Sequence, residues 1–378
     1  MPFFVINFIT LCRLYLYALW RGRARRAPQH LRRFLILQPA KLGDMVCITP
    51  MCAALKRQYP QCIVAVGGNA LNKQLLADHP LVDEYIVLEK TSGKNVEQFV
   101  KGSFDAAFLV TPSFDMVAAL FCARIPLISA PYVVDGWSPY QTKAYRLATF
   151  LFRTAPHHMG QYAPREYLRL LETVGIVTDD TTKTLAYSSE ADKKISSLLS
   201  TFTTEDFLVG VAPGVGNKIK RWDPVNFAEV AKHLFSRYGA KILIIGGPAD
   251  TSEVSVMRDA LASTVPYLDV SGTLSIDELK AVIQRLHLFV GVDTGPLYIA
   301  EAFQIPTVAV IGPVDEREQP PRGKRHEVVY LADRKKAEVH IMNARVYNKQ
   351  EARRQIDDIT VAMVTSKIDD LIVRINKK

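Results

Sequence analysis

The chain has 378 residues, of which 48% are hydrophobic and 22% charged, a balance typical of folded domains and unlike that of disordered chains. Its formal net charge is +9, but residues 1–33 contain seven arginines and no acidic residue, and basic and acidic residues nearly balance over the rest. The charge therefore argues against nucleic-acid binding by the body of the chain and assigns the basic excess to one end.

The N-terminal segment begins with a mainly apolar stretch, and most of its arginines follow that stretch. Residues 2–20 contain no charged residue except Arg13, and Asn7, Thr10, Arg13 and Tyr17 recur at three- to four-residue spacing, which predicts a helix with one weakly polar stripe. The arginines that follow would lie among anionic head groups, at about 1 kcal/mol each. We predict a helix lying on a membrane surface. A single span is the alternative, and Arg13 disfavours it.

The first half of the body alternates strands with helices, which predicts a parallel sheet covered on both faces. The loop at 38–44 follows the first strand, and residues 49–60 and 73–77 are the predicted helices. The predicted strands are 34–37, 63–66, 84–88 and 106–110.

The same alternation restarts after a polar stretch rich in Ser and Thr, which we predict to be a linker. In the second half, a helix is expected from Pro224 to Tyr238 because Gly239 would end it. The fold class is therefore α/β, with two doubly wound domains. The predicted parts are a membrane-contact segment (1–33), an acceptor domain (34–186), a linker (187–206), a donor domain (207–354) and a C-terminal helix (355–378) expected to pack back on the first domain.

The residues Asp293, Thr294, Gly295 and Pro296 form the most informative stretch of the chain. They lie between a predicted strand and a predicted helix, and Asp or Thr can cap that helix while Pro suits its first turn. A helix entered this way points free N–H groups and a positive dipole end at the loop, where a diphosphate can bind. An ordinary capped helix is the alternative interpretation.

Two further loops follow strands of the second half, at 213–222 and 246–250. Lys220 supplies a cation for phosphate, and Asp250 can accept from ribose hydroxyls. Taken singly, Lys220 in a solvated basic turn and Asp250 as a helix cap, worth about 1 kcal/mol, are the favoured interpretations. Because ligands bind beyond the carboxyl ends of parallel strands, the coincidence of three such loops favours a nucleotide-diphosphate site.

The loop after the first strand contributes Lys41, Gly43 and Asp44. A carboxylate facing a nucleotide site is placed to deprotonate an acceptor hydroxyl, with helix capping as the alternative role of Asp44. We expect Lys41 and Gly43, together with Gly214 and Asn217, to contact ligands in a cleft between the two domains.

The remaining chemistry-bearing residues do not point to a metal. The five cysteines form no CxxC pair, the eight histidines form no HExxH array, and the chain contains no Asp-x-Asp. Scattered cysteines in odd number favour reduced thiols in the cytoplasm. No bound metal is expected.

Residues 41–46 (KLGDMV), followed by Thr49 and Pro50, resemble the first signature of glycosyltransferase family 9, the ADP-heptose:lipopolysaccharide heptosyltransferases. The three later loops resemble its other signatures in order and spacing, so the resemblance covers roughly residues 34–315. It implies the GT-B fold, with Rossmann-like domains facing a central cleft, inversion at the sugar carbon, and no required metal.

The resemblance also implies residue roles. Asp44 would be the catalytic base, Lys220 would bind the donor phosphates, Asp250 would lie near the ribose, and residues 293–296 would hold the diphosphate and sugar. Tyr298 stands where the family usually has His, and a phenol hydrogen-bonds without being a cation at neutral pH. We therefore expect Tyr298 to contact the donor sugar, which need not be heptose.

These expectations combine into an enzyme of lipopolysaccharide core synthesis on the cytoplasmic face of the inner membrane. It would use no cofactor, take a nucleotide-diphosphate sugar such as ADP-heptose as donor, and glycosylate a lipid-linked saccharide. Two alternatives stay open. One is a GT-B sugar-nucleotide epimerase or hydrolase, and the other is a non-catalytic membrane-associated relic that binds nucleotide sugar. Neither explains the membrane helix together with Asp44 and Lys220.

Overall fold

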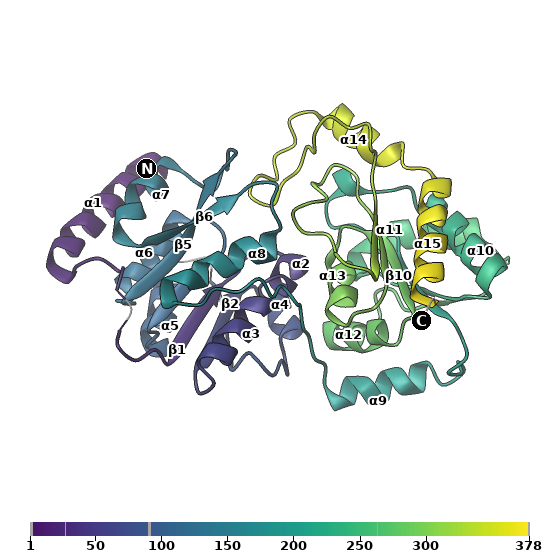
Figure 1. Ribbon diagram of the computed structural model, residues 1–378, viewed down its shortest axis with the longest axis horizontal. Helices are drawn as coiled ribbons and strands as arrows, with labels where there is room; N and C mark the ends of the chain where they lie inside the picture. The colour runs from purple at the N-terminus through teal and green to yellow at the C-terminus, as the bar shows by residue number, and fades with distance from the viewer. Residues whose placement is uncertain (1–2, 27, 90–91, 263, 377–378) are drawn as a thin grey trace. The chain divides into compact units, whose positions relative to one another are not determined.

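The computed structural model describes residues 3–26, 28–89, 92–262 and 264–376 (Figure 1). The chain divides into two units, each with its own sheet and core. The first comprises Met1–Thr182 with Ile341–Asn343, and the second comprises Lys183–His340 with Ala344–Lys378.

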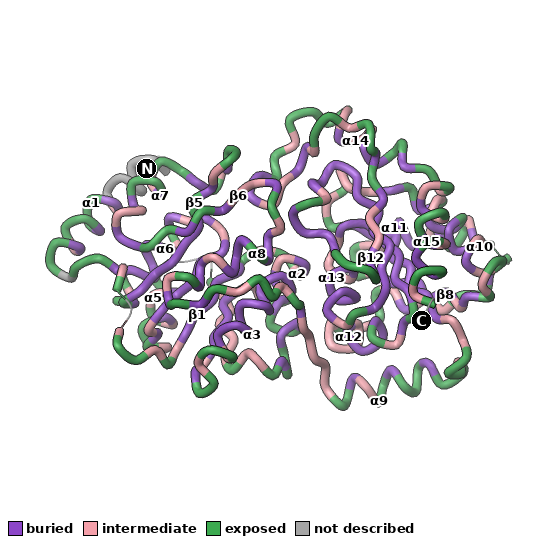
Figure 2. The backbone as a smooth tube through the Cα atoms, viewed as in Figure 1, coloured by how far each residue is buried: buried purple, intermediate pink, exposed green. Residues whose placement is uncertain are grey.

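The first unit contains a six-stranded sheet in the order β3-β2-β1-β4-β5-β6, and all neighbouring strands pair in parallel. The central strands are buried on both faces, as hydrophobic runs in a parallel sheet require (Figure 2). The strands are β1 (Arg33–Leu37), β2 (Ile63–Gly68), β3 (Glu84–Val87), β4 (Ala106–Leu109), β5 (Leu127–Val134) and β6 (Arg153–His158). The helices are α1 (Phe3–Arg21), α2 (Leu42–Val46), α3 (Thr49–Gln58), α4 (Ala70–Leu75), α5 (Ser92–Gly102), α6 (Phe114–Cys122), α7 (Lys143–Ala148) and α8 (Ala163–Leu168).

The predicted N-terminal helix is present as α1, but it is part of the first unit and not a separate segment. Leu11, Leu14 and Ala18 are buried in the core of that unit, since this apolar face packs beside α7. Tyr15 stacks on Phe150 with ring centroids 4.0 Å apart, and its hydroxyl donates to the Leu147 carbonyl. Among the described residues, no helix combines the length and the apolar character that crossing a membrane requires.

The second unit repeats the architecture with the strand order β12-β11-β10-β7-β8-β9, again parallel throughout. Its strands are β7 (Leu208–Ala212), β8 (Lys241–Ile244), β9 (Tyr267–Asp269), β10 (Leu288–Val292), β11 (Thr307–Val310) and β12 (His326–Val329). Its helices are α9 (Ser189–Leu198), α10 (Pro224–Tyr238), α11 (Thr251–Leu261), α12 (Ile276–Gln284), α13 (Gly295–Ala302), α14 (Lys349–Asp357) and α15 (Val361–Asn376). The prediction of two parallel α/β domains is confirmed.

Helix α10 illustrates how local sequence sets these boundaries. The Asp223 carboxylate accepts from the Val225 N–H at 3.0 Å, Pro224 occupies the first helical position, and Gly239 ends the helix with a φ of 65°. A left-handed φ suits glycine, so both ends lie where the sequence predicts them.

Two expectations about the domain boundaries are wrong. Residues 187–206 do not link the units, because they belong to the second one, where α9 packs on α12. The C-terminal segment also belongs to the second unit and forms two helices. The apolar stripe of α15, from Val364 to Ile372, is buried in the core of that unit beside α10 and β12, so it does not return to the first domain.

Candidate functional site

Three neighbouring strands of the second sheet, β10, β7 and β8, carry the loops that the sequence singles out. Residues 213–222 follow β7, 246–250 follow β8, and 293–296 follow β10. Because the strands are parallel and adjacent, their carboxyl ends place all three loops at one edge of the sheet. The contacts between these loops decide which side chains meet.

The first two loops touch at Gly214 and Asp250. A Cβ built on Gly214 would lie 2.1 Å from Cγ of Asp250, so only glycine leaves room for the carboxylate. The Asp250 carboxylate accepts from the Gly247 N–H at 2.8 Å, which closes its own turn. Asp250 therefore stabilises the loop that precedes it, and the partly exposed carboxylate lies over the backbone of the 213–222 loop.

The first and third loops are joined through Lys220 and Asp293. The Lys220 ammonium donates to the Asp293 carbonyl at 2.7 Å and to Oδ2 of its carboxylate at 2.8 Å. The Lys220 side chain is 19% exposed and that of Asp293 is 9% exposed, so the pair is partly withdrawn from water. A cation thus lies at the start of α13, where the sequence predicts an anion site.

The buried Tyr298 completes this group from inside α13. Its hydroxyl donates to Oδ1 of Asp293, and the residue is only 2% exposed. The phenol is therefore directed at Asp293, while its expected contact with a donor sugar stays a prediction. Sequence reasoning missed this role, because a spacing of five residues across a strand-to-helix turn does not show which side chains meet.

The N-terminus of α13 begins with Thr294 in an extended conformation, and the described Thr294 side chain makes no capping hydrogen bond. Gly295 and Pro296 form the first turn and are only half-buried, as Thr294 is. The N-terminal end of this helix therefore retains the positive dipole end and backbone donor that suit an anion.

The other basic residues of the 213–222 loop have different partners. Lys218 pairs with the buried Glu253 carboxylate at 2.5 Å, and Arg221 lies 3.3 Å from the same carboxylate. The Asn217 side chain accepts from the Ile219 N–H at 3.3 Å and caps the short turn that contains Lys220. Burial, the largest single effect, raises the pKa of Glu253, but the hydrogen bonds from Lys218, Ser252 and the backbone together with the charge of Lys218 lower that pKa overall. Lys220 therefore differs from the neighbouring basic residues in its tertiary contacts, which the sequence does not show.

The first-domain candidates lie on one short element. The predicted loop at 38–44 is in part wrong, because α2 begins at Leu42 and contains Gly43 and Asp44. The Asp44 carboxylate accepts from the Lys41 N–H at 3.2 Å, so it occupies a capping position while remaining partly exposed. Asn69 and Asn72 both donate to the Ala40 carbonyl, at 2.9 and 2.8 Å, and hold the entry to this turn.

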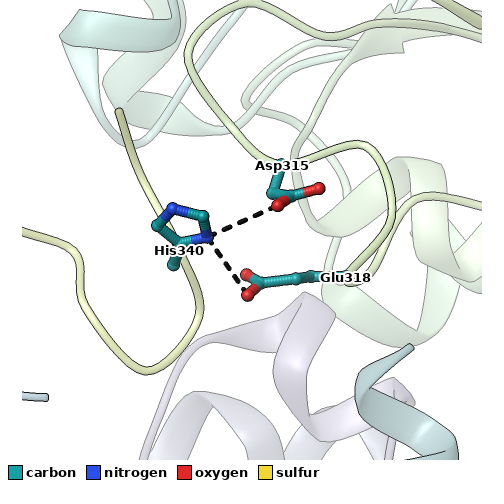
Figure 3. A group of neighbouring side chains, drawn as sticks. All are labelled: Asp315, Glu318 and His340. Atoms are coloured by element: carbon teal, nitrogen blue, oxygen red, sulfur yellow. Dashed lines mark hydrogen bonds and ion pairs between the residues drawn. The ribbon is translucent and has the colours of Figure 1, made fainter. Parts of the chain in front are cut away.

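A second polar group of the second unit, absent from the sequence prediction, comprises Asp315, Glu318 and His340 (Figure 3). His340 Nδ1 lies 3.2 Å from Oε1 of Glu318 and 3.6 Å from Oδ2 of Asp315, and both carboxylates are 1% exposed. The hydrogen bond to Glu318 raises the pKa of His340 above its ordinary value, against the effect of burial.

These are the described residues with the side-chain types and spacing to hold a metal ion. Arg317, however, donates to both oxygens of Asp315, at 2.9 and 2.7 Å. When His340 is protonated, the positive charges of His340 and Arg317 balance the negative charges of Asp315 and Glu318. We therefore interpret the group as a charge-balanced clamp that joins the loop after β11 to the chain at His340.

Comparisons with known proteins find relatives of this chain. The model of glycosyltransferase family 9 (heptosyltransferase) matches residues 106–346, which include Lys220, Asp250 and Asp293 and leave out Asp44. Lipopolysaccharide heptosyltransferase 3 of Escherichia coli K12 is 26% identical over 284 residues, which cover 72% of this chain and 80% of that protein.

Solved structures share the fold. A glycosyl transferase family 9 protein from Veillonella parvula superimposes with a TM-score of 0.74 at 19% identity, covering 92% of this chain and 99% of that one. The E. coli ADP-heptose lps heptosyltransferase II gives a TM-score of 0.70 at 21% identity, covering 90% and 99%. The two parallel sheets therefore form a GT-B-like fold.

Proposed function

Because the chain belongs to glycosyltransferase family 9, we propose that this glycosyltransferase moves heptose or a related sugar from a nucleoside-diphosphate donor to a lipid-linked saccharide of the bacterial lipopolysaccharide core. The observation that carries the proposal is the Lys220–Asp293 pair at the N-terminus of α13, inside the matched region. A relative that acts in lipopolysaccharide synthesis supports the acceptor class, and ADP-heptose is the donor we favour.

The donor unit supplies charge stabilisation to the departing nucleoside diphosphate. As the glycosidic bond to the donor breaks, negative charge grows on the diphosphate, and the Lys220 ammonium and the α13 N-terminus are placed to stabilise it. Asp250, held against Gly214, is the group we assign to the ribose hydroxyls. In this proposal the fixed cation and helix end take the place of a metal in the transfer step, and no cofactor takes part.

The acceptor unit supplies the base. As the acceptor oxygen attacks the anomeric carbon, its proton passes to the Asp44 carboxylate, and a single displacement inverts the configuration of that carbon. The partial exposure of Asp44 supports this role, since a fully enclosed capping carboxylate would have no access to an acceptor. Lys41 and Gly43, beside it, are the acceptor contacts we assign.

A membrane surface is the partner we propose for α1. The buried face of this helix leaves Leu16, Leu19 and Trp20 exposed at 68%, 84% and 73%. Arg13 is exposed on the same side of the helix, three residues before Leu16, so apolar and cationic groups are combined as on interfacial helices. Adsorption to the cytoplasmic face of the inner membrane would bring the enzyme to its lipid-linked acceptor.

Transfer from purified ADP-heptose to lipid-linked core saccharide, followed by mass spectrometry of the product, tests the proposal. Formation of a glycosylated lipid with release of ADP, undiminished by EDTA, is the expected outcome. Turnover of the donor without an acceptor would favour a hydrolase or epimerase, and donor binding without turnover would favour the non-catalytic alternative.

A further inference from the structure

The carboxylate of Asp293 has one partner on each oxygen. Oδ2 accepts from the Lys220 ammonium at 2.8 Å, and Oδ1 accepts from the Tyr298 hydroxyl. Asp293 is 7% exposed and Tyr298 only 2% exposed, so this bond is shielded from water. The three side chains form a chain of contacts in which Asp293 is shared by Lys220, from the loop after β7, and Tyr298, from helix α13.

This arrangement has a consequence for charge. The Asp293 carboxylate neutralises the ammonium that an incoming anion needs, and it also repels that anion. The Tyr298 hydroxyl donates to the opposite oxygen and so stabilises the negative charge of the carboxylate. The carboxylate then interacts less strongly with the Lys220 ammonium. If that donor were lost, a buried carboxylate oxygen would lack its hydrogen bond, and the carboxylate would turn toward the Lys220 ammonium that already contacts it.

We infer that Tyr298 is a positioning residue of the anion site. Its hydroxyl fixes the orientation of Asp293, so that Asp293 directs the Lys220 ammonium toward the α13 N-terminus without sequestering it. The ligand, a diphosphate group, contacts Lys220 and the helix end and does not touch Tyr298. The inference rests on the proposed function only in requiring that a diphosphate binds at Lys220.

A double-mutant cycle with inorganic pyrophosphate and ADP as calorimetric probes tests this coupling. Tyr298→Phe should weaken binding of either probe by about 10- to 150-fold, the range for one hydrogen bond to a charged group. In the Lys220→Ala background, the same change should alter Kd by less than about two-fold, because Tyr298 acts through the missing ammonium. A full effect in that background, or an unchanged Kd in the single variant, overturns the inference.

Tyr145 provides a matched control in the first unit. It is also fully buried, and its hydroxyl donates to the Pro131 carbonyl at 2.6 Å. Tyr145→Phe should lower the Tm and leave the pyrophosphate Kd unchanged. If it weakens binding as much as Tyr298→Phe, the effect is general loosening of the fold and the inference fails.

Tyr298→His is the second variant, in case removal of the hydroxyl prevents folding. An imidazole N–H can still donate to Asp293, so the pyrophosphate Kd should stay within about three-fold of the wild-type value. A histidine variant as weak as Lys220→Ala contradicts the inference. Glycosyl transfer is not among these readouts: a cycle that behaves as expected in a protein without transferase activity would refute the proposed function and leave this inference standing.

Discussion

Gly214 and Asp250 are in direct contact across two loops, since a Cβ on Gly214 would lie 2.1 Å from Cγ of Asp250. Gly214→Ala should therefore displace the carboxylate and its turn, at about 1–3 kcal/mol of stability for an overpacked site. It should also weaken ADP binding. Thermal melts and calorimetry measure both, and Gly93→Ala, where a Cβ would meet no atom within 4 Å, is the control expected to leave both unchanged.

Lys220 should be the cation of the donor site, and Lys218 should not. Lys220→Ala is expected to cost about 1–3 kcal/mol in ADP affinity, the range for a charge-assisted hydrogen bond. Lys218→Ala, two residues away and paired with Glu253, should reduce stability more than affinity. ADP should raise the Tm of the wild type in EDTA as well as in Mg²⁺. Equal losses of affinity in the two variants would indicate a diffuse basic surface in place of a site.

Asp44 should affect turnover without affecting the donor. Asp44→Asn removes the base while it keeps the shape, and general-base loss typically lowers kcat by about 10²- to 10⁴-fold. The Kd for ADP should hardly change, because the donor site we propose lies in the second unit. Measuring kcat beside Kd separates the roles. If Asp44 only accepts the Lys41 N–H, then Asp44→Ala should lower the Tm and retain its turnover.

The exposed face of α1 should bind anionic lipid. Replacing Leu16, Leu19 and Trp20 with serine should abolish flotation with vesicles that contain anionic lipid while the Tm stays near that of the wild type, because these side chains are exposed. Serine in place of Val177, which is 83% exposed in the same unit, is the control. Undiminished flotation of the triple variant would remove α1 from the membrane contact.

The clamp at His340 should make stability depend on pH. The folded-state pKa of His340 is raised by its hydrogen bond to Glu318, so its stabilisation is fully present below the unfolded value of about 6.5 and is lost as pH rises through the folded value. His340→Gln should therefore lower the Tm most at pH 6 and progressively less toward pH 9. A Tm difference that is constant over this range would show that His340 does not titrate between pH 6 and pH 9.

Much of this architecture can be predicted from hydrophobic runs and turn residues. The strands from β1 to β4, the boundaries of α10 and the three donor loops follow from local patterns that the folded chain keeps, as Asp223 and Gly239 show. The boundaries between the parts of the chain cannot be predicted in this way. The polarity of residues 187–206 suggests a linker, yet α9 packs one face on α12. An amphipathic pattern predicts that a helix has a buried face, but it does not identify the element against which that face packs.

The site shows the same division. Residue types and spacing identify Lys220, Asp250 and Asp293 as candidates, because capping, charge and glycine content are local properties. The pairing of Lys218 with Glu253, the contact of Gly214 with Asp250 and the bond from Tyr298 to Asp293 are tertiary contacts. The clamp of Asp315 and Glu318 with His340 joins residues more than twenty positions apart, and no local pattern points to it.

Leu11, Leu14 and Ala18 place one face of α1 in the core of the first unit, while the opposite face is exposed. The helix is therefore not an independent targeting segment that could be exchanged or removed without affecting the folded first unit. Cutting it away would open the core beside α7. With the membrane contact we propose, changing the outer face would alter only membrane binding, so surface binding and folding would depend on different residues of one helix.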